Sequence, residues 1–218
     1  MQMRAVLWDL DGTLIDSIAL IVASFRHTYA THVGGDDSSI DWVAGIGRPL
    51  SDQLAEYARD AAELEAMIAT YVEHNLTHHD RMAKPFEGAA DTVRALHAEG
   101  IEQAIVTGKR RRGTTYGVRL LGVEDVLTTW VCADDVERGK PDPEGVLRAL
   151  ELLEVDASEA IFVGDSPHDM EAGRRAGVKT VAAAWGPFSI EQLEPHQPSL
   201  WLEDVRDALE LATLGTSN

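Results

Sequence analysis

Apolar and polar residues follow two different periods along this chain, and each period predicts a type of element. Residues 5–8 are a short unbroken apolar run bounded by polar residues, which is typical of a strand buried on both faces. From residue 18 to residue 29, apolar side chains recur every three or four positions, which indicates a helix that Gly34 and Gly35 end. The same helical spacing continues to residue 82, with a break near residues 59–62.

After residue 88 the pattern alternates regularly between short apolar runs and helical spacing. We expect strands at 102–106, 129–132, 160–163, 178–182 and 200–202, and helices at 88–99, 111–121, 143–153, 168–176 and 204–213. Strands separated by helices favour parallel β-α-β units. The sequence therefore predicts an α/β fold with a doubly wound, mostly parallel sheet.

The long helical region predicts a second structural unit. Residues 17–82 show no convincing strand, yet a strand precedes them and strand–helix alternation resumes after them. We therefore expect a core domain formed by residues 1–16 and 83–218, with residues 17–82 as an inserted α-helical cap domain and residues 84–88 as the linker back. The alternative is an ordinary helical region of the main fold.

Two aspartates stand at the end of the first expected strand. Asp9 and Asp11 are two residues apart, and Gly12 after them suits a tight turn. Two carboxylates at the end of a buried strand repel each other and are costly to desolvate, so a bound divalent cation is a simple way to hold both. A calcium-binding loop would need glycine at its sixth position, which is Leu14 here. The alternative is that both aspartates only form the turn.

Other chemically capable residues follow the ends of other strands. In doubly wound sheets, ligands bind at the carboxyl ends of the strands. Taken in chain order, the residues at those ends are Thr107, Gly108, Lys109, Lys140, Asp165 and Asp169. Each has an ordinary explanation alone, as a helix cap, a turn residue or a surface lysine. Their joint placement at one edge of the sheet is hard to obtain by chance, so we expect one shared site.

The ordered motifs resemble those of a known family. They are Asp9-Leu10-Asp11-Gly12-Thr13, Val106-Thr107-Gly108-Lys109, Lys140-Pro141 and Gly164-Asp165-Ser166-Pro167-His168-Asp169. In these motifs, and over nearly its whole length, the chain resembles the haloacid dehalogenase-like superfamily, in its phosphoglycolate phosphatase-like branch with a helical cap.

The resemblance implies a Mg²⁺-dependent phosphatase that hydrolyses a small-molecule phosphate monoester through an aspartyl-phosphate. Mg²⁺ favours carboxylate oxygens and would offset the charge of a phosphate ester, which otherwise repels nucleophiles. Asp9 would be the nucleophile, and Asp11 would protonate the leaving oxygen and then take a proton from water. A dehalogenase needs no acid at the second position, so Asp11 favours phosphate esters.

The resemblance also implies the remaining roles. The metal would be held by Asp9, the backbone carbonyl of Asp11 and Asp165, with Asp169 further out or bonded to Lys140. Thr107 and Lys140 would take part in catalysis, the latter by neutralising charge on the transferring group. The phosphoryl oxygens would be bound by Leu10, Thr107, Gly108 and Lys140, and the rest of the substrate by Arg48, Lys109 and Thr13.

Three features depart from the family pattern or stand outside it. Related phosphatases often carry Asn where Gly108 stands, so a contact is lost or space is gained. Residues 109–112 form a cationic run at a helix N-terminus, where cations oppose the helix dipole; it either meets a second anionic group on the substrate or is merely solvated. His74 and His78 have the i, i+4 spacing of a zinc site, but no pattern completes one, and a solvated helix end is the expected explanation.

Composition limits the partners. The 218-residue chain carries 19 basic and 37 acidic residues, a formal charge of −18 that disfavours nucleic acid and anionic membranes as partners. The only cysteine is Cys132, so no internal disulfide is possible, which fits a reducing cytosol. Asp9 interrupts the first apolar run early and residues 18–25 are far too short to span a bilayer, so we expect a cytoplasmic protein.

The sequence leaves some points open. The oligomeric state is either monomer or homodimer. One rival function is a phosphomutase acting on a sugar phosphate. Another is a phosphorylatable signalling receiver, which also combines an acidic pair, a threonine and a lysine, but is much shorter and has no helical insert after its first strand.

Overall fold

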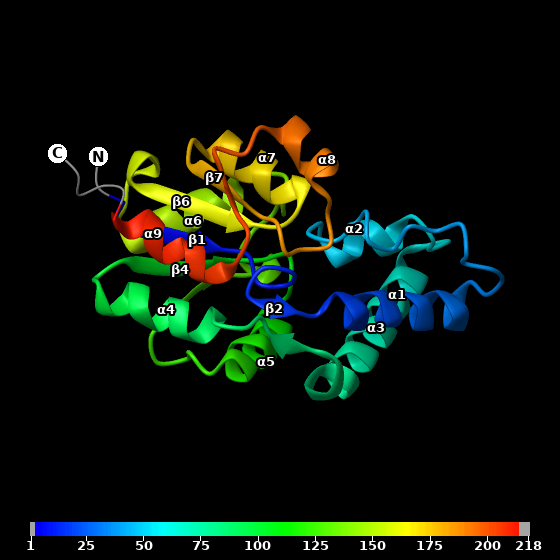
Figure 1. The fold of residues 1–218 in the computed structure, drawn as a ribbon. Coiled ribbons are helices and arrows are strands. Elements are labelled where there is room, and N and C mark those ends of the chain that lie inside the picture. Colours follow the sequence, from blue (N-terminus) through cyan, green and yellow to red (C-terminus); the bar gives the residue numbers. More distant parts are fainter. Residues whose placement is uncertain (1–2, 214–218) are drawn as a thin grey trace.

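A computed structural model of the protein describes residues 3–213 of the chain. Its core is a six-stranded sheet in which every neighbouring pair of strands is parallel (Figure 1). The strand order is β5 (Thr129–Val131), β4 (Glu102–Val106), β1 (Ala5–Trp8), β6 (Ala160–Gly164), β7 (Lys179–Ala183) and β8 (Leu200–Leu202). The predicted doubly wound parallel sheet is confirmed.

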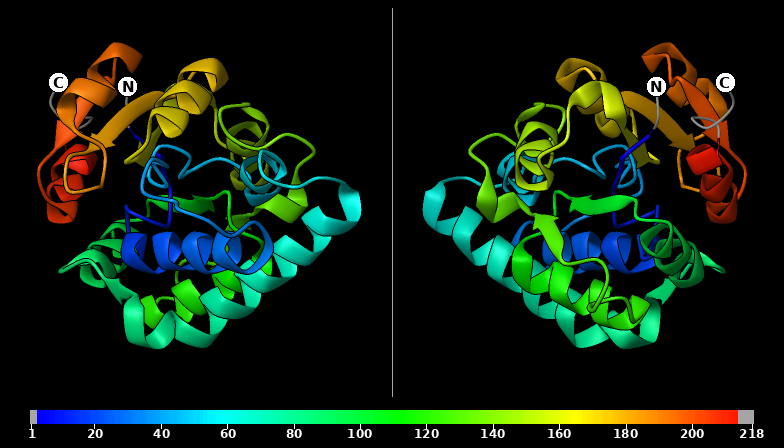
Figure 2. Two further views of the ribbon diagram at one scale, coloured as in Figure 1. Left: turned by 90° about the vertical axis from the view of Figure 1, so that its right-hand side faces the viewer. Right: turned by 90° about the vertical axis from the view of Figure 1, so that its left-hand side faces the viewer.

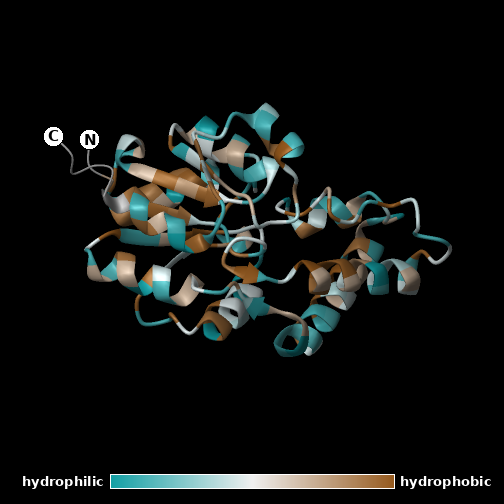
Figure 3. Cartoon of the chain, viewed as in Figure 1, coloured by the Kyte–Doolittle hydropathy of each residue, from teal (hydrophilic) through white to brown (hydrophobic). Residues whose placement is uncertain are grey.

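Helices cover both faces of this sheet, and β1 shows why the strands are apolar throughout. Val6 and Trp8 belong to one buried apolar cluster, whereas Ala5 and Leu7 belong to another, so alternate side chains enter two separate core layers. All four are fully buried. The same distribution is visible in Figure 3, where the central strands are mostly hydrophobic and the helices carry mixed surfaces.

The core helices lie close to their expected positions. They are α4 (Ala89–Ala98), α5 (Arg111–Leu121), α6 (Glu144–Leu153), α7 (Pro167–Ala176), α8 (Ile190–Leu193) and α9 (Ala208–Thr213). Short 3₁₀ turns occupy Ala133–Asp135, Ala157–Glu159, Glu194–His196 and Val205–Asp207. The sequence pattern missed α8, and the last helix begins at Ala208 because its expected first turn is 3₁₀. No helix within residues 3–213 is both long enough and apolar enough to cross a bilayer.

The helical region after β1 lies at the end of the sheet toward which the strands point (Figure 1). It contains α1 (Ile18–His32), α2 (Leu50–Ala55) and α3 (Ala61–Met82). The two views of Figure 2 show α3 beside α1 and close to α5, and both pairs of helices are in contact. Phe25 stacks on Trp42, with ring centroids 5.5 Å apart, inside a third apolar cluster that continues onto Met170 and Phe188 of the core.

A small two-stranded sheet joins this helical region to the core. β2 (Ile15–Asp16) pairs antiparallel with β3 (Lys84–Pro85), so the chain leaves and re-enters the core at one place. The segment 84–88, expected only as a linker, therefore begins as a strand. The division into a core and a cap domain stays a prediction, and these paired strands lie where we expect its boundary.

Candidate active site

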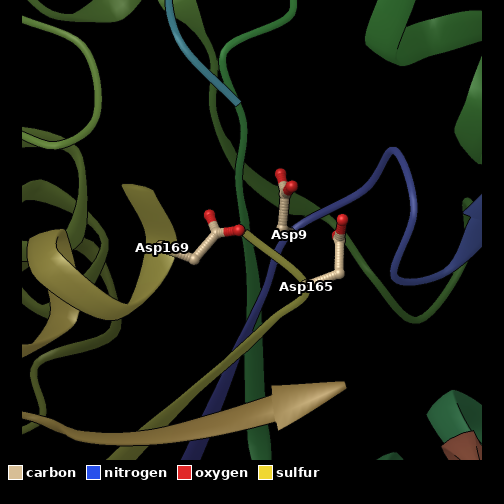
Figure 4. Close-up of side chains that lie close together, drawn as sticks. All are labelled: Asp9, Asp165 and Asp169. Atoms are coloured by element: carbon tan, nitrogen blue, oxygen red, sulfur yellow. The ribbon is translucent and has the colours of Figure 1, made fainter. Parts of the chain in front are cut away.

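Four charged side chains from separate parts of the chain meet at the carboxyl ends of β1 and β6. Asp9 follows β1, Asp165 follows β6, and Asp169 lies in the first turn of α7 (Figure 4). Lys140 Nζ lies 2.9 Å from Asp9 Oδ1 and 2.6 Å from Asp169 Oδ1. Each of these four residues is at most 4% exposed. The structure thus brings together the residues that the sequence placed at one edge of the sheet.

Asp169 owes its position to the start of α7. Its Oδ2 accepts hydrogen bonds from the Ser166 backbone N–H (3.0 Å) and hydroxyl (2.6 Å), which forms a capping box at the helix N-terminus. Its Oδ1 accepts a hydrogen bond from Lys140. Both carboxylate oxygens are therefore engaged, so Asp169 is placed to hold Lys140 rather than to offer a free oxygen to a metal.

Asp9 and Asp165 differ from Asp169 because each keeps an unsatisfied oxygen. Asp9 Oδ1 and Asp165 Oδ2 are buried without a hydrogen-bond partner, although Asp9 Oδ1 is close to Lys140. One carboxylate oxygen from each of Asp9, Asp165 and Asp169 lies within 4.8 Å of the others. Unsatisfied buried carboxylate oxygens are costly, and a hard divalent cation satisfies them. The oxygens of Asp9 and Asp165 fit Mg²⁺, with Asp169 nearby but engaged by Ser166 and Lys140.

The pKa values of the cluster reflect the same excess of negative charge. Burial raises the pKa of Asp9 to about 7, an effect that Lys140 opposes and Asp169 reinforces. Burial, followed by the charges of Asp169 and Asp9, holds the pKa of Asp165 well above its ordinary value. Burial acts to lower the pKa of Lys140, but the charges of Asp169 and Asp9 prevail and raise it. One ammonium is thus shared among three buried carboxyl groups.

The turn after Asp9 brings the backbone against Asp165. Gly12 has φ +89°, and a Cβ at this position would lie 2.5 Å from Asp165 Oδ2, so only glycine fits. Thr13 Oγ1 donates a 2.6 Å hydrogen bond to Asp165 Oδ1. We expected Thr13 to bind substrate; the structure instead buries it completely and places its hydroxyl behind the proposed metal carboxylate, because the tight turn at Gly12 points it there.

Asp11 has partners that the sequence pattern did not indicate. Lys109 Nζ lies 2.6 Å and 2.9 Å from its two oxygens, and Ser17 Oγ donates to Oδ1 at 2.6 Å. Although burial acts to raise the pKa of Asp11, Lys109 and the hydrogen bond from Ser17 lower it overall. Asp11 is therefore held as a carboxylate, and Lys109, expected on the substrate, is engaged by Asp11 in this arrangement.

Ser17 shows how a tertiary contact replaces the local contact that its residue type favours. It occupies the N-cap position of α1, as its residue type indicates, but its side chain makes no capping hydrogen bond. Its hydroxyl is used by Asp11 instead. Ser166 was also missed, although the serine–aspartate spacing of a capping box at 166 and 169 was a usable signal.

Thr107 and Gly108 lie where β4 ends, beneath a loop of the helical region. Thr107 is 6% exposed, and its hydroxyl accepts a hydrogen bond from the Lys109 backbone N–H. A Cβ on Gly108 would lie 3.0 Å from the Gly47 carbonyl oxygen and 3.3 Å from that of Arg48. The space beside Gly108 is therefore filled by the backbone of this loop, not left open for a larger leaving group.

A cavity of about 570 Å³ lies between the core and the helical region. Asp9, Asp11, Thr107 and Lys109 line it from the core side, and Arg48 lines it from the helical side. Arg48 also pairs with Glu56 at 3.0 Å. The side chain of Leu10 is fully buried, so this residue can offer only its backbone to a phosphate.

The histidines outside this site form a separate cluster on the helical region. His74 stacks on His27, with ring centroids 4.5 Å apart, and meets His78 edge-on at the same separation. Among residues 3–213, Asp9, Asp165 and Asp169 are the only group of three or more acidic, histidine or cysteine residues arranged to hold a metal ion. Within the described residues, the i, i+4 spacing of His74 and His78 therefore belongs to a cluster of packed histidine rings and not to a metal site.

This fold, together with paired acidic residues and a buried lysine at the strand ends, defines a class of enzymes. The family model described as haloacid dehalogenase-like hydrolase matches residues 6–183, and the chain belongs to this family. It is therefore a hydrolase with an α/β fold, and the predicted family membership is confirmed.

Named relatives refine the comparison. The chain is 38% identical over 211 residues to "Pyrophosphatase PpaX" of Halalkalibacterium halodurans and 37% identical to the same-named protein of Bacillus cereus strain G9842, in each case covering 97% of both chains. A solved structure described as a putative phosphoglycolate phosphatase from Lactobacillus plantarum is 26% identical, with a TM-score of 0.85 over 97% of this chain and 100% of that one. A putative β-phosphoglucomutase from Bacteroides vulgatus, 24% identical, shares the fold with a TM-score of 0.83 over 100% of this chain and 91% of that one.

Proposed function

We propose that this protein is a Mg²⁺-dependent phosphatase that hydrolyses a small-molecule phosphate monoester through an aspartyl-phosphate on Asp9. The observation that carries the proposal is the pair of buried carboxylate oxygens on Asp9 and Asp165, of which the first has only the ion pair with Lys140 at 2.9 Å and the second has no partner. Asp9, Asp165 and the backbone carbonyl of Asp11 would hold Mg²⁺. When bound, the ion supplies positive charge that offsets the negative charge of the phosphoryl group.

In the first step, a carboxylate oxygen of Asp9 attacks phosphorus and the bond to the leaving oxygen breaks. Asp11 lies on the same loop and lines the same cavity, so it is placed to give that oxygen a proton. In the second step, Asp11 takes a proton from the water that attacks the phosphoryl group and releases Asp9. The first step needs Asp11 protonated, which is how the second step of the previous turnover leaves it. The second step needs Asp11 as a carboxylate, which is the form that Lys109 and Ser17 favour.

Lys140 would neutralise charge that builds on the transferring group, because its ammonium lies 2.9 Å from the attacking carboxylate. Asp169 is a positioning residue, since it fixes Lys140 through a 2.6 Å contact. Thr107 and the backbone at Leu10 and Gly108 would hydrogen-bond phosphoryl oxygens. Residues 17–82 would act as a cap domain that limits access of water to this site.

The substrate is open among several small phosphates. Inorganic pyrophosphate belongs on the list because relatives that match 97% of this chain carry the name pyrophosphatase. A phosphomutase would transfer the phosphoryl group to a sugar instead of water, and analysis of the products from a sugar phosphate separates the two. A signalling receiver would form a long-lived phospho-aspartate without rapid turnover. We place the enzyme in the cytoplasm, with its oligomeric state unassigned.

The test uses the purified protein with aryl phosphates of matched size and different leaving groups. We expect hydrolysis that requires Mg²⁺ and that Asp9→Asn abolishes. Asp11→Asn should reduce hydrolysis strongly for a poor leaving group such as phenol and less for 4-nitrophenol, which leaves without a proton. Activity retained by a folded Asp9→Asn variant would remove Asp9 as the nucleophile, and equal losses for both leaving groups would remove Asp11 as the acid.

A further inference from the structure

A second cavity of about 540 Å³ lies at the seam between α3 and α5. Apolar side chains from Val72, Leu76 and Tyr116 line it together with the guanidinium-bearing Arg112. Val72, Leu76 and Arg112 also line the active-site cavity. The two hollows therefore adjoin at these three side chains, which face both of them.

Arg112 is unusual in so acidic a protein. Of the cations lining the active-site cavity, Arg48 pairs with Glu56, Lys109 with Asp11 and Arg138 with Asp142, whereas neither Arg110 nor Arg112 has an ion pair in the described part of the chain. Of these two arginines, Arg112 alone also lines the seam. Arg112 takes part in no ion pair or side-chain hydrogen bond with any residue in the described part of the chain, even though Glu73 lines the same seam. A chain with a net charge of −18 offers many carboxylates, so an unpaired arginine at a cavity wall is free for an external anion.

We propose that the seam between α3 and α5 is a distal substrate subsite, which takes an apolar segment against Val72 and Leu76 and a second anionic group at Arg112. The ligand is thus an organic phosphate monoester with an extended carbon body and a distant carboxylate or second phosphate. This inference rests on the proposed phosphatase function and deepens it. Inorganic pyrophosphate has no carbon body, so it leaves this subsite empty.

The size of each of the two cavities supports an organic ligand. Cavities of about 300–1,000 Å³ with mostly apolar walls and a few polar groups are typical of sites for ligands with carbon skeletons. The proposed catalytic groups lie at the carboxyl ends of the strands and Arg112 lies at the seam, with Val72 and Leu76 between them on the shared wall and Glu73 and Thr77 as the other polar residues of the seam. That spacing favours a molecule that is charged at both ends.

The test compares ω-carboxyalkyl phosphates with uncharged alkyl phosphates of equal chain length. Binding is measured by calorimetry in the Asp9→Asn background with Mg²⁺, so that the readout does not depend on turnover. We expect the carboxylate to improve affinity most at one chain length that reaches Arg112. Arg112→Gln should lower the ratio of affinities for the carboxylated and the uncharged ester roughly tenfold, since the variant loses a hydrogen bond to a charged group. Arg119→Gln, at the other end of α5 and paired with Glu124, is the matched control.

A second variant tests the apolar wall. Affinity for uncharged alkyl phosphates should rise by up to about fourfold per methylene while the chain lies on Val72 and Leu76. Leu76→Gln should flatten this rise. The subsite is overturned if the preference for carboxylated over uncharged esters does not depend on chain length. It is also overturned if Arg112→Gln and Arg119→Gln change that preference equally. If binding behaves as expected but wild-type enzyme hydrolyses none of these esters, the subsite stands and the proposed phosphatase function fails.

Discussion

Removing the charge of Asp9 should stabilise the metal-free protein while it destroys activity. Asp9 is 3% exposed, and burial raises its pKa from 3.8 to about 7. A folded-state pKa above the unfolded value means that the ionised form is disfavoured by folding. The wild-type protein therefore loses stability as the pH rises from 3.8 to about 7, and Asp9→Asn does not.

The magnitude follows from the size of this shift. At about 1.36 kcal/mol per pKa unit, a rise from 3.8 to about 7 corresponds to about 4 kcal/mol at pH 8, of which less than half is already present at pH 5. For a protein of this length, 4 kcal/mol corresponds to an increase in Tm of roughly 10 °C. The difference in free energy of unfolding between Asp9→Asn and wild type should therefore more than double between pH 5 and pH 8.

The assay is thermal unfolding in EDTA at both pH values, with Glu65→Gln, an exposed carboxylate on α3, as the control. Excess Mg²⁺ should reverse the order of stability at pH 8, because a site that retains Asp9 binds the ion more tightly than one that lacks it. An Asp9→Asn variant that is no more stable than wild type in EDTA at pH 8, or an advantage that does not grow with pH, would refute this account of the buried charges.

Two further variants examine single contacts of the site. Thr13→Val removes the 2.6 Å hydrogen bond that orients the buried Asp165, so the Mg²⁺ concentration for half-maximal activity should rise roughly tenfold, and Tm should fall because a buried oxygen loses its donor. An unchanged Mg²⁺ dependence argues against this positioning role. Gly108→Asn introduces a side chain where the carbonyls of the 47–48 loop lie within about 3 Å of the Cβ position. Steady-state kinetics should then show a lower kcat, and limited proteolysis should cleave the displaced loop faster. A Gly108→Asn variant with the wild-type kcat and proteolysis rate would show that this contact is dispensable.

Much of the site could be predicted because its residues follow the ends of buried parallel strands. Asp9 and Asp165 lie after neighbouring strands β1 and β6, and the parallel arrangement alone brings their side chains to one edge. Lys140 comes from a loop before α6, so the strand pattern indicated its end of the sheet but not the 2.6 Å contact with Asp169.

Other contacts could not be predicted because they join segments far apart in the chain. The hydroxyl of Thr13 lies on Asp165, and Lys109 lies on Asp11 instead of facing the cavity freely. Gly108 was expected to lose a contact or gain space, yet its missing side chain admits the backbone at 47–48. Arg112 belongs to the cationic run that the sequence shows at residues 109–112. Only the structure distinguishes it from Lys109, because Lys109 pairs with Asp11 and Arg112 has no ion pair in the described part of the chain.

The sequence by itself determined the fold, the strand ends at which chemistry occurs and the identities of the charged residues there. It could do so because hydrophobic periodicity reports local burial, and parallel β-α-β connections leave one edge for ligands. Tertiary structure decided which of these charges are paired, which oxygens remain unsatisfied and how the helical region meets the core. Those outcomes depend on distances between side chains that no local pattern encodes. At separations of about 3 Å, these distances decide whether a group can bind a metal, hold a neighbouring side chain or bind a substrate.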